Sequence, residues 1–299
     1  MFKVIFQDTQ DNEIFAKYGK KAVREDYYVV DKNCFCVADG VTRDLKDGKA
    51  TFYPKTEEEV LKVVEKYPNP SGAYEAAKIV CEEFVREVSI HKQNMTQEKM
   101  KKIVEKINDV VGKINQGRTI DYLAEDYYCC VAVGGIVIGE KLICFSIGDC
   151  HVIALDKNKK VVFETINNHA WFEDFLREEY SKKPGYDWNK NEFRKEIRKL
   201  YRNHPNLKKD GKDITFGVLS GEKEAMYYVD TYIVDLNEIQ YICAYSDGCE
   251  PNFKNQEEIE KTLQDPQQAV KQGKEKTLVI YEKGLDRRRK KWSENRHLP

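Results

Sequence analysis

Strand-like and helical periods occur in blocks along this chain, and the order of the blocks limits the folds open to it. Residues 1–7 alternate apolar and polar side chains, and 26–31 and 34–39 are two apolar runs joined by a short turn. Helical spacing covers 56–114, strand patterning returns at 127–166, and charged helical segments cover 170–203. A doubly wound parallel sheet would need strict β-α-β alternation, so the blocks predict an α+β fold with antiparallel sheets packed against helices.

The boundaries of several elements can be predicted from local signals. Thr56 and Glu59 have the spacing of a capping box, and Ser71 and Thr96 each precede a long helical run. Four strand runs at 127–138, 141–149, 150–156 and 160–166 follow one another through short connections, so we expect one antiparallel meander. The last strand is expected at 275–283. We predict one domain over residues 1–284 and a basic tail at 285–299.

Composition and cysteine usage exclude several classes of protein. With 41% hydrophobic and 34% charged residues, the chain is typical of a globular protein rather than a disordered one. A formal net charge of -1 gives no overall attraction to nucleic acid. The longest apolar stretch, 129–138, is about half of a membrane span. The nine cysteines form no CxxC pair, so we expect buried free thiols and a cytoplasmic protein without membrane contact.

Acidic residues stand at the ends of several predicted strands. Asp39 and Asp247 each end an apolar run and precede a glycine, Asp149 ends another, and Glu25-Asp26 begins one. Alone, each is more often a turn residue or a solvated strand start. If they converge, however, their mutual repulsion calls for cations, and hard divalent ions such as Mg²⁺ or Mn²⁺ prefer oxygen ligands. Two such ions held close together form a centre for phosphoryl chemistry.

In chain order, "RED", "VADG", "GAYEAA", "SIGDC", "FGVLSGE" and "ICAYSDG" resemble the metal-dependent serine/threonine protein phosphatases of the type 2C family. The resemblance spans roughly residues 20 to 282 and depends on the order of the motifs rather than on any single one. It implies a four-layer α-β-β-α sandwich that holds two Mn²⁺ or Mg²⁺ ions, with a third at a weaker site. It also implies that a water bridging the ions attacks the phosphorus of a phosphorylated protein substrate.

The same resemblance assigns roles to individual residues. Asp26, Asp39 and Asp247 would be the metal-binding catalytic residues, and Asp149 would belong to the third, weaker site. Glu25 would support Asp26 through metal-bound water, and Gly40 would offer its carbonyl. Lys21 would bind the substrate phosphate in the place of an arginine, as a point charge without the bidentate fork.

The chain departs from the family pattern at three places. Lys274-Glu275 occupies the position of an acidic pair whose first member binds metal, so a cation stands where a ligand is expected. A bulge would be needed to turn Glu275 inward. Val41 replaces a histidine found in some members, and Glu250 follows Asp247 by three residues instead of four. The alternative to an enzyme is therefore a catalytically inactive pseudophosphatase that binds phosphoproteins or partners.

Two segments leave their roles open. The insert at 170–203 has the charge and aromatic content of a surface that selects substrate proteins, and equally of a helical lid over the sheet edge. The basic run in the tail at 285–299 is typical of a solvated segment. The alternative interpretation of this run is a targeting signal or a contact with an anionic surface or nucleic acid.

Overall fold

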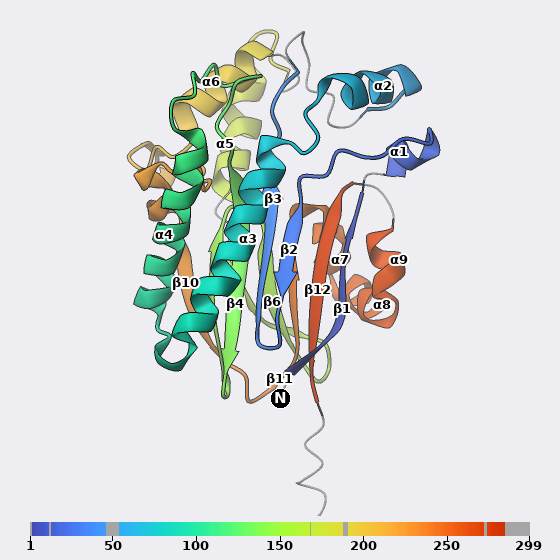
Figure 1. Cartoon of the computed structure of the whole chain (residues 1–299), viewed down its shortest axis with the longest axis vertical. Coiled ribbons are helices and arrows are strands. Elements are labelled where there is room, and N and C mark those ends of the chain that lie inside the picture. Colours follow the sequence, from blue (N-terminus) through green and yellow to red (C-terminus); the bar gives the residue numbers. More distant parts are fainter. Residues whose placement is uncertain are drawn as a thin grey trace, which may run out of the picture.

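Two antiparallel sheets of five strands each face one another in the computed structural model (Figure 1). The structure describes residues 2–11, 13–45, 54–167, 169–187, 191–271 and 274–284. The first sheet has the order β1 (Phe2–Gln10), β12 (Lys276–Lys283), β11 (Ile239–Tyr245), β6 (His151–Asp156) and β7 (Val161–Glu164). The second has the order β10 (Asp230–Asp235), β5 (Lys141–Ile147), β4 (Cys130–Ile138), β3 (Cys34–Gly40) and β2 (Tyr27–Val30).

Helices cover the outer face of each sheet. The long helices α3 (Gly72–His91) and α4 (Gln97–Asn115) pack on the second sheet, and α7 (Glu250–Phe253), α8 (Gln256–Gln264) and α9 (Pro266–Val270) pack on the first (Figure 1). The predicted α+β fold and its four-layer α-β-β-α arrangement are therefore confirmed.

The remaining helices gather at one end of the sandwich, at the top in Figure 1. They are α1 (Glu13–Lys17), α2 (Glu57–Lys66), α5 (Ala170–Glu179) and α6 (Asn191–Tyr201). A small hairpin of β8 (Lys208–Lys209) and β9 (Lys212–Asp213) follows α6, and short 3₁₀ turns occur at η1 (Lys92–Asn94), η2 (Tyr180–Lys182), η3 (Lys223–Tyr227) and η4 (Asp247–Cys249). The helices of the 170–203 insert thus lie at the same end as α1 and α2.

The helix starts predicted from the sequence are confirmed. Thr56 accepts a hydrogen bond from the backbone N–H of Glu59, whose carboxylate accepts from the Thr56 N–H in return, both at 3.3 Å. The hydroxyl of Ser71 caps α3, and that of Thr96 caps α4. These side chains satisfy backbone donors that a helix leaves unpaired at its first turn, which is why the local sequence signal was sufficient.

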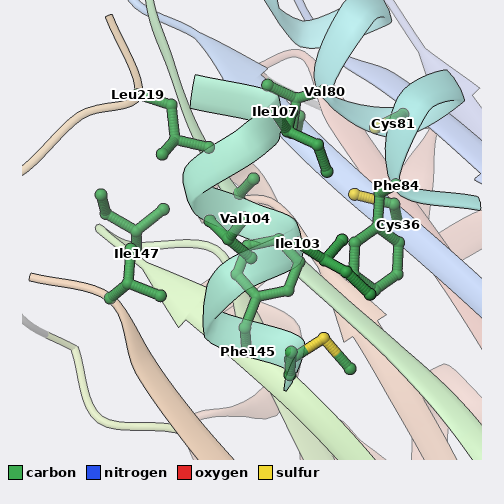
Figure 2. Packing of buried hydrophobic residues seen from close by; sticks show 14 of the residues in the cluster. Cys36, Val80, Cys81, Phe84, Ile103, Val104, Ile107, Phe145, Ile147 and Leu219 are labelled. Atoms are coloured by element: carbon green, nitrogen blue, oxygen red, sulfur yellow. The ribbon is translucent and has the colours of Figure 1, made fainter. Parts of the chain in front are cut away.

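Helical periodicity places the apolar side chains of α3 and α4 against the second sheet. Figure 2 shows Val80 and Phe84 of α3 beside Ile103 and Ile107 of α4. The ring of Phe84 lies 5.0 Å from that of Phe145 on β5. A second apolar layer, between the two sheets, comes from the opposite faces of the strands and includes Phe35, Val133, Val152, Ile242 and Val279. The strands are buried on both faces, which explains their nearly continuous apolar runs.

The prediction of a single meander over 127–166 is wrong. β4 pairs with β5 in one sheet, whereas β6 pairs with β7 in the other, and β5 and β6 do not pair. The chain crosses between the sheets at the link between Ile147 and His151, where Gly148 has a φ of 83°. A strand that is buried on both faces has the same apolar sequence whichever sheet it belongs to. The sequence pattern therefore does not distinguish one four-stranded meander from two pairs of strands in separate sheets.

All nine cysteines are buried and none forms a disulfide, as predicted. In the part of the chain that the structure describes, no helix combines the length and the apolar content that a bilayer crossing requires. The expected basic tail, 285–299, lies outside the described residues, and the one-domain boundary at 284 stays a prediction.

Candidate functional site

Several strand ends from both sheets meet at one end of the sandwich. In the second sheet, Tyr27 pairs with Ala38 and Ala132 pairs with Ile147, so the start of β2 and the end of β5 lie beside the end of β3. In the first sheet, Tyr245 pairs with both His151 and Leu278, which aligns the end of β11 with the starts of β6 and β12. The acidic residues next to these ends are thereby brought to one end of the molecule.

The glycine of each Asp-Gly pair is required by close packing, and Asp247-Gly248 also begins the 3₁₀ turn η4. Neither Gly40 nor Gly248 has a positive φ. A Cβ atom on Gly40 would lie 2.7 Å from the backbone of Ala73 in α3, and one on Gly248 would lie 2.0 Å from the carbonyl oxygen of Glu275. Only glycine fits at these approaches, and the close packing brings the preceding Asp39 and Asp247 toward the same space.

A cavity of about 790 Å³ opens at this end of the sandwich. One part of its wall consists of acidic side chains from the strand ends, together with Gly40: Asp26, Asp39, Asp149, Asp247 and Glu275. The predicted site residues at 26, 39, 40, 149 and 247 thus line a single cavity. Glu25 and Lys21 are not part of its wall.

Glu25 is buried beside the cavity and its carboxylate accepts three hydroxyl hydrogen bonds. Tyr67 and Ser71 donate to Oε1 at 2.6 and 2.7 Å, and Thr42 donates to Oε2 at 2.7 Å. Burial raises the pKa of Glu25, and the three hydroxyls oppose the rise. In this geometry Glu25 joins the start of α3, the end of α2 and the segment after β3, which suits a positioning role.

Lys21 lines a different cavity, of about 520 Å³, whose wall includes Asp11, Arg24 and Lys271. The structure therefore does not bring the predicted phosphate-binding lysine together with the carboxylates. Sequence spacing placed it four residues before Glu25, but the side chain leaves the backbone on the other side of this segment.

Asp26 and Glu275 are fixed by hydrogen bonds from distant elements. Ser246 and Thr277 both donate to Asp26 Oδ2 at 2.7 Å. The carboxylate of Glu275 accepts from the backbone N–H groups of Glu25 and Asp26 at 2.9 to 3.2 Å. Glu275 therefore does turn inward, where it holds the start of β2 against the start of β12.

The carboxylates raise the pKa values of one another. Burial, followed by the neighbouring Asp26 and Asp247, raises the pKa of Asp39 well above its usual value. Burial and then Asp149 raise the pKa of Asp247, against which Lys274 acts; its Nζ lies 3.6 Å from Asp247 Oδ2. Burial also acts to raise the pKa of Asp149, but the adjacent His169 outweighs it and leaves the pKa lowered. The cluster thus carries more negative charge than its own cations balance.

We expect the stability of the metal-free protein to fall as pH rises from about 5 to about 7. Burial raises the pKa of Asp26 from 3.8 to about 7, so the folded state keeps a proton in this range that the unfolded state has lost. One such group contributes at most about 1.4 kcal/mol per pH unit. Asp126 and Asp149, whose pKa values are lowered, are ionised in both states here and add no slope.

Urea unfolding in EDTA across this pH range measures the effect. Asp26→Asn should flatten the fall, since asparagine does not titrate. A wild-type free energy of unfolding that rises over the same range, with the same slope in Asp26→Asn, would contradict the prediction.

Another part of the cavity wall is cationic and aromatic, and most of it comes from the insert. Arg194 and Arg198 of α6, and Arg202 directly after this helix, are only 7%, 6% and 3% exposed. Their spacing of four residues was visible in the sequence but was not singled out as a site signal. His169, Phe172, Tyr186 and Phe216 complete this part of the wall.

Ion pairs fasten the arginine face to the rest of the molecule. Arg202 makes two hydrogen bonds to Asp126, at 2.7 and 2.9 Å, and Arg194 lies 2.9 Å from Asp44. Arg198 donates to the backbone carbonyls of Thr42 and Tyr122 at 2.6 and 3.0 Å. These contacts join α6 and the residue after it to Asp44, Thr42 and the segment at 122–126.

The acidic wall fits a hard divalent cation in the type of its donors and in its charge. Its ligand atoms are oxygens, and among the described residues none donates a hydrogen bond to the Asp39 carboxylate. Within the same residues, however, no group of three or more histidine, cysteine, aspartate or glutamate side chains is placed to hold a metal ion. The donors are thus assembled without forming a closed ligand cage.

No protein-family model and no curated protein matches this chain. Among solved structures, a bacterial serine phosphatase matches with a TM-score of 0.53 at 14% identity, over 96% of this chain and 98% of its own. The serine/threonine phosphatase PstP/Ppp of Mycobacterium tuberculosis matches with a TM-score of 0.55 at 11% identity, over 95% and 99%. The PstP catalytic domain in complex with two manganese ions matches with a TM-score of 0.51, also at 11% identity, over 94% and 99%. The resemblance seen in the sequence is thereby confirmed for the fold.

Proposed function

We propose that this protein is a divalent-metal-dependent phosphatase that hydrolyses phosphoserine and phosphothreonine in protein substrates. The observation that carries the proposal is the cavity at the end of the sandwich, where a wall of carboxylates faces a wall of buried arginines. The fold, which it shares with serine/threonine phosphatases, supports the same reaction class.

Asp26, Asp39 and Asp247 are the proposed ligands for two Mn²⁺ or Mg²⁺ ions, with the carbonyl of Gly40 beside them and Asp149 at a third, weaker site. When bound, such ions activate water and neutralise the charge of a phosphoryl group. Glu275, Ser246 and Thr277 keep Asp26 in place through the hydrogen bonds described above. The manganese bound by the PstP domain supports the choice of metal.

Arginines of α6 take the role that the sequence assigned to Lys21. A phosphomonoester carries negative charge, and these guanidinium groups attract it by their own charge, since their hydrogen bonds go to Asp44, Asp126 and backbone carbonyls. Arg194, Arg198 and Arg202 line the proposed cavity, whereas Lys21 lines another one. The aromatic side chains next to them, Phe172 and Tyr186 among them, offer an apolar surface to the peptide that carries the phosphate.

Phosphate release from phosphoserine and phosphothreonine peptides tests the proposal. With Mn²⁺ we expect turnover at least roughly 100-fold above that in EDTA, because the carboxylate wall alone repels a phosphate. Mg²⁺ in place of Mn²⁺ identifies the preferred ion, and free phosphoserine in place of the peptide tests whether a protein substrate is required. Equal activity with EDTA and with metal would discard the proposal.

An inactive phosphoprotein-binding pseudophosphatase is the second candidate, favoured by one observation. Lys274 lies 3.6 Å from Asp247, at a position where the resemblance implies a metal ligand. In this case the protein should bind a phosphopeptide with similar affinity in Mn²⁺ and in EDTA and release no phosphate from it. Calorimetric titration with the peptide distinguishes the two candidates.

A further inference from the structure

Two adjacent residues before β12 both line the cavity but make different contacts. The carboxylate of Glu275 accepts the backbone N–H groups of Glu25 and Asp26, so it is committed to holding two strands together. Lys274, one residue earlier, lines the cavity, and its Nζ lies 3.6 Å from Asp247 Oδ2. The chain therefore brings an ammonium group to the place where a second acidic ligand would complete the carboxylate wall.

The charge around Lys274 distinguishes it from an ordinary surface lysine. Asp26, Asp39, Asp149, Asp247 and Glu275 line the same cavity, all of them acidic. The Lys274 side chain is 52% exposed and that of Asp247 is 33% exposed. Exposed ion pairs of this kind contribute little to stability, so a structural role does not explain the position. An ammonium group beside clustered carboxylates does reduce their mutual repulsion.

We infer that the ammonium group of Lys274 supplies the positive charge beside Asp247 that a divalent ion would otherwise supply. Any ion that binds there must approach a like charge and displace the ammonium from its carboxylate partner. The ion pair of Lys274 is with Asp247 Oδ2, so its repulsion acts first on an ion that binds at Asp247. The protein therefore binds one ion more tightly than the second, and Lys274 sets the difference. This inference rests on the proposed metal-dependent function.

Isothermal titration of the full chain with Mn²⁺ tests the inference. Lys274→Met removes the charge and keeps a side chain of similar length, and Lys274→Gln is a second neutral variant. Lys274→Arg keeps the charge. Lys254→Met is the matched control, because Lys254 is exposed at the end of α7 and does not line the cavity.

Removing the charge should tighten the weaker Mn²⁺ site by about tenfold or more, since two like charges a few ångströms apart no longer repel. We expect Lys274→Gln to behave like Lys274→Met. Lys274→Arg and Lys254→Met should leave both sites as in the wild type. As a second readout, the neutral variants should unfold close to the wild-type temperature in EDTA, and Mn²⁺ should raise their unfolding temperature more than that of the wild type.

The outcomes separate this inference from the proposed function. Wild-type Mn²⁺ affinities that persist in Lys274→Met and Lys274→Gln, together with normal phosphatase activity, overturn the inference and leave the function standing. No Mn²⁺ binding in any variant overturns both. Binding gained only in the neutral variants supports the inference and shows the wild type to be a pseudophosphatase.

Discussion

Asp39→Asn should lower the Mn²⁺-dependent rate of phosphopeptide hydrolysis by at least roughly 100-fold. Asp39 ends β3 at the cavity wall, and its pKa is raised well above normal by burial and by the carboxylates around it. Asparagine has the same shape but removes one negative charge from the proposed metal ligands, so metal binding and turnover should both weaken.

The same substitution should stabilise the metal-free protein. Relief of the repulsion among Asp39, Asp26 and Asp247 should raise the free energy of unfolding in EDTA at pH 8 by about 1 kcal/mol or more. Loss of activity with a gain in stability is not what a folding defect produces. Urea unfolding and phosphate release from one preparation measure both effects.

A matched aspartate provides the control for this experiment. Asp109 lies exposed on α4 and does not line the cavity. Asp109→Asn should therefore change neither the rate nor the free energy of unfolding appreciably. Hydrolysis at the wild-type rate by Asp39→Asn would remove the central support for the proposed metal centre.

Asp126→Ala should lower the free energy of unfolding by about 3 to 5 kcal/mol. Both oxygens of the Asp126 carboxylate bind Arg202, at 2.7 and 2.9 Å, and each of these side chains is 1% exposed. Arg198 Nη1 lies 3.4 Å from the same carboxylate. Alanine leaves buried guanidinium groups without their counter-charge, and their desolvation is no longer offset.

The loss of stability should be largest in the insert, because the Asp126 carboxylate joins α6 and Arg202 to the segment before β4. Proteolysis within residues 170–203 should therefore accelerate in Asp126→Ala. Asp126→Leu combined with Arg202→Met should recover part of the stability, since an apolar pair leaves no unpaired charge between them.

An exposed ion pair provides the reference for the stability change in Asp126→Ala. Lys102 and Glu98 lie one helical turn apart on α4, with their side chains 69% and 79% exposed. Lys102→Ala should lower the free energy of unfolding far less than Asp126→Ala does. A similarly small loss in Asp126→Ala would show that the arginine face of α6 is not held by its buried ion pairs.

Much of the fold could be predicted from local sequence because local forces decide it. A hydroxyl at Thr56, Ser71 or Thr96 caps the following helix wherever that helix lies, and helical spacing of apolar residues fixes which face of α3 and α4 is buried. The α+β order of the blocks predicted the layers. The division of β4–β7 between two sheets was missed, because strands buried on both faces carry no mark of their sheet.

The candidate site divides in the same way between local and distant causes. Whether a residue ends a strand depends mainly on its neighbours in the sequence. The sequence alone therefore identified four candidates that line one cavity: Asp26, Asp39, Asp149 and Asp247. The direction of Lys21, the three hydroxyls around Glu25 and the inward turn of Glu275 depend on elements far away in the chain.

By itself, the sequence predicted many of the residues that end strands and begin helices, and it identified Asp26, Asp39, Asp149 and Asp247 as candidate site residues. The tertiary structure alone decided that strand ends of the two facing sheets bring Asp39 and Asp247 to one cavity, that α6 and the residue after it bring three arginines to its wall, and that Lys274 stands beside Asp247. The physical reason is that periodicity and capping act within a few residues, whereas these contacts join segments that lie well beyond that range in the chain.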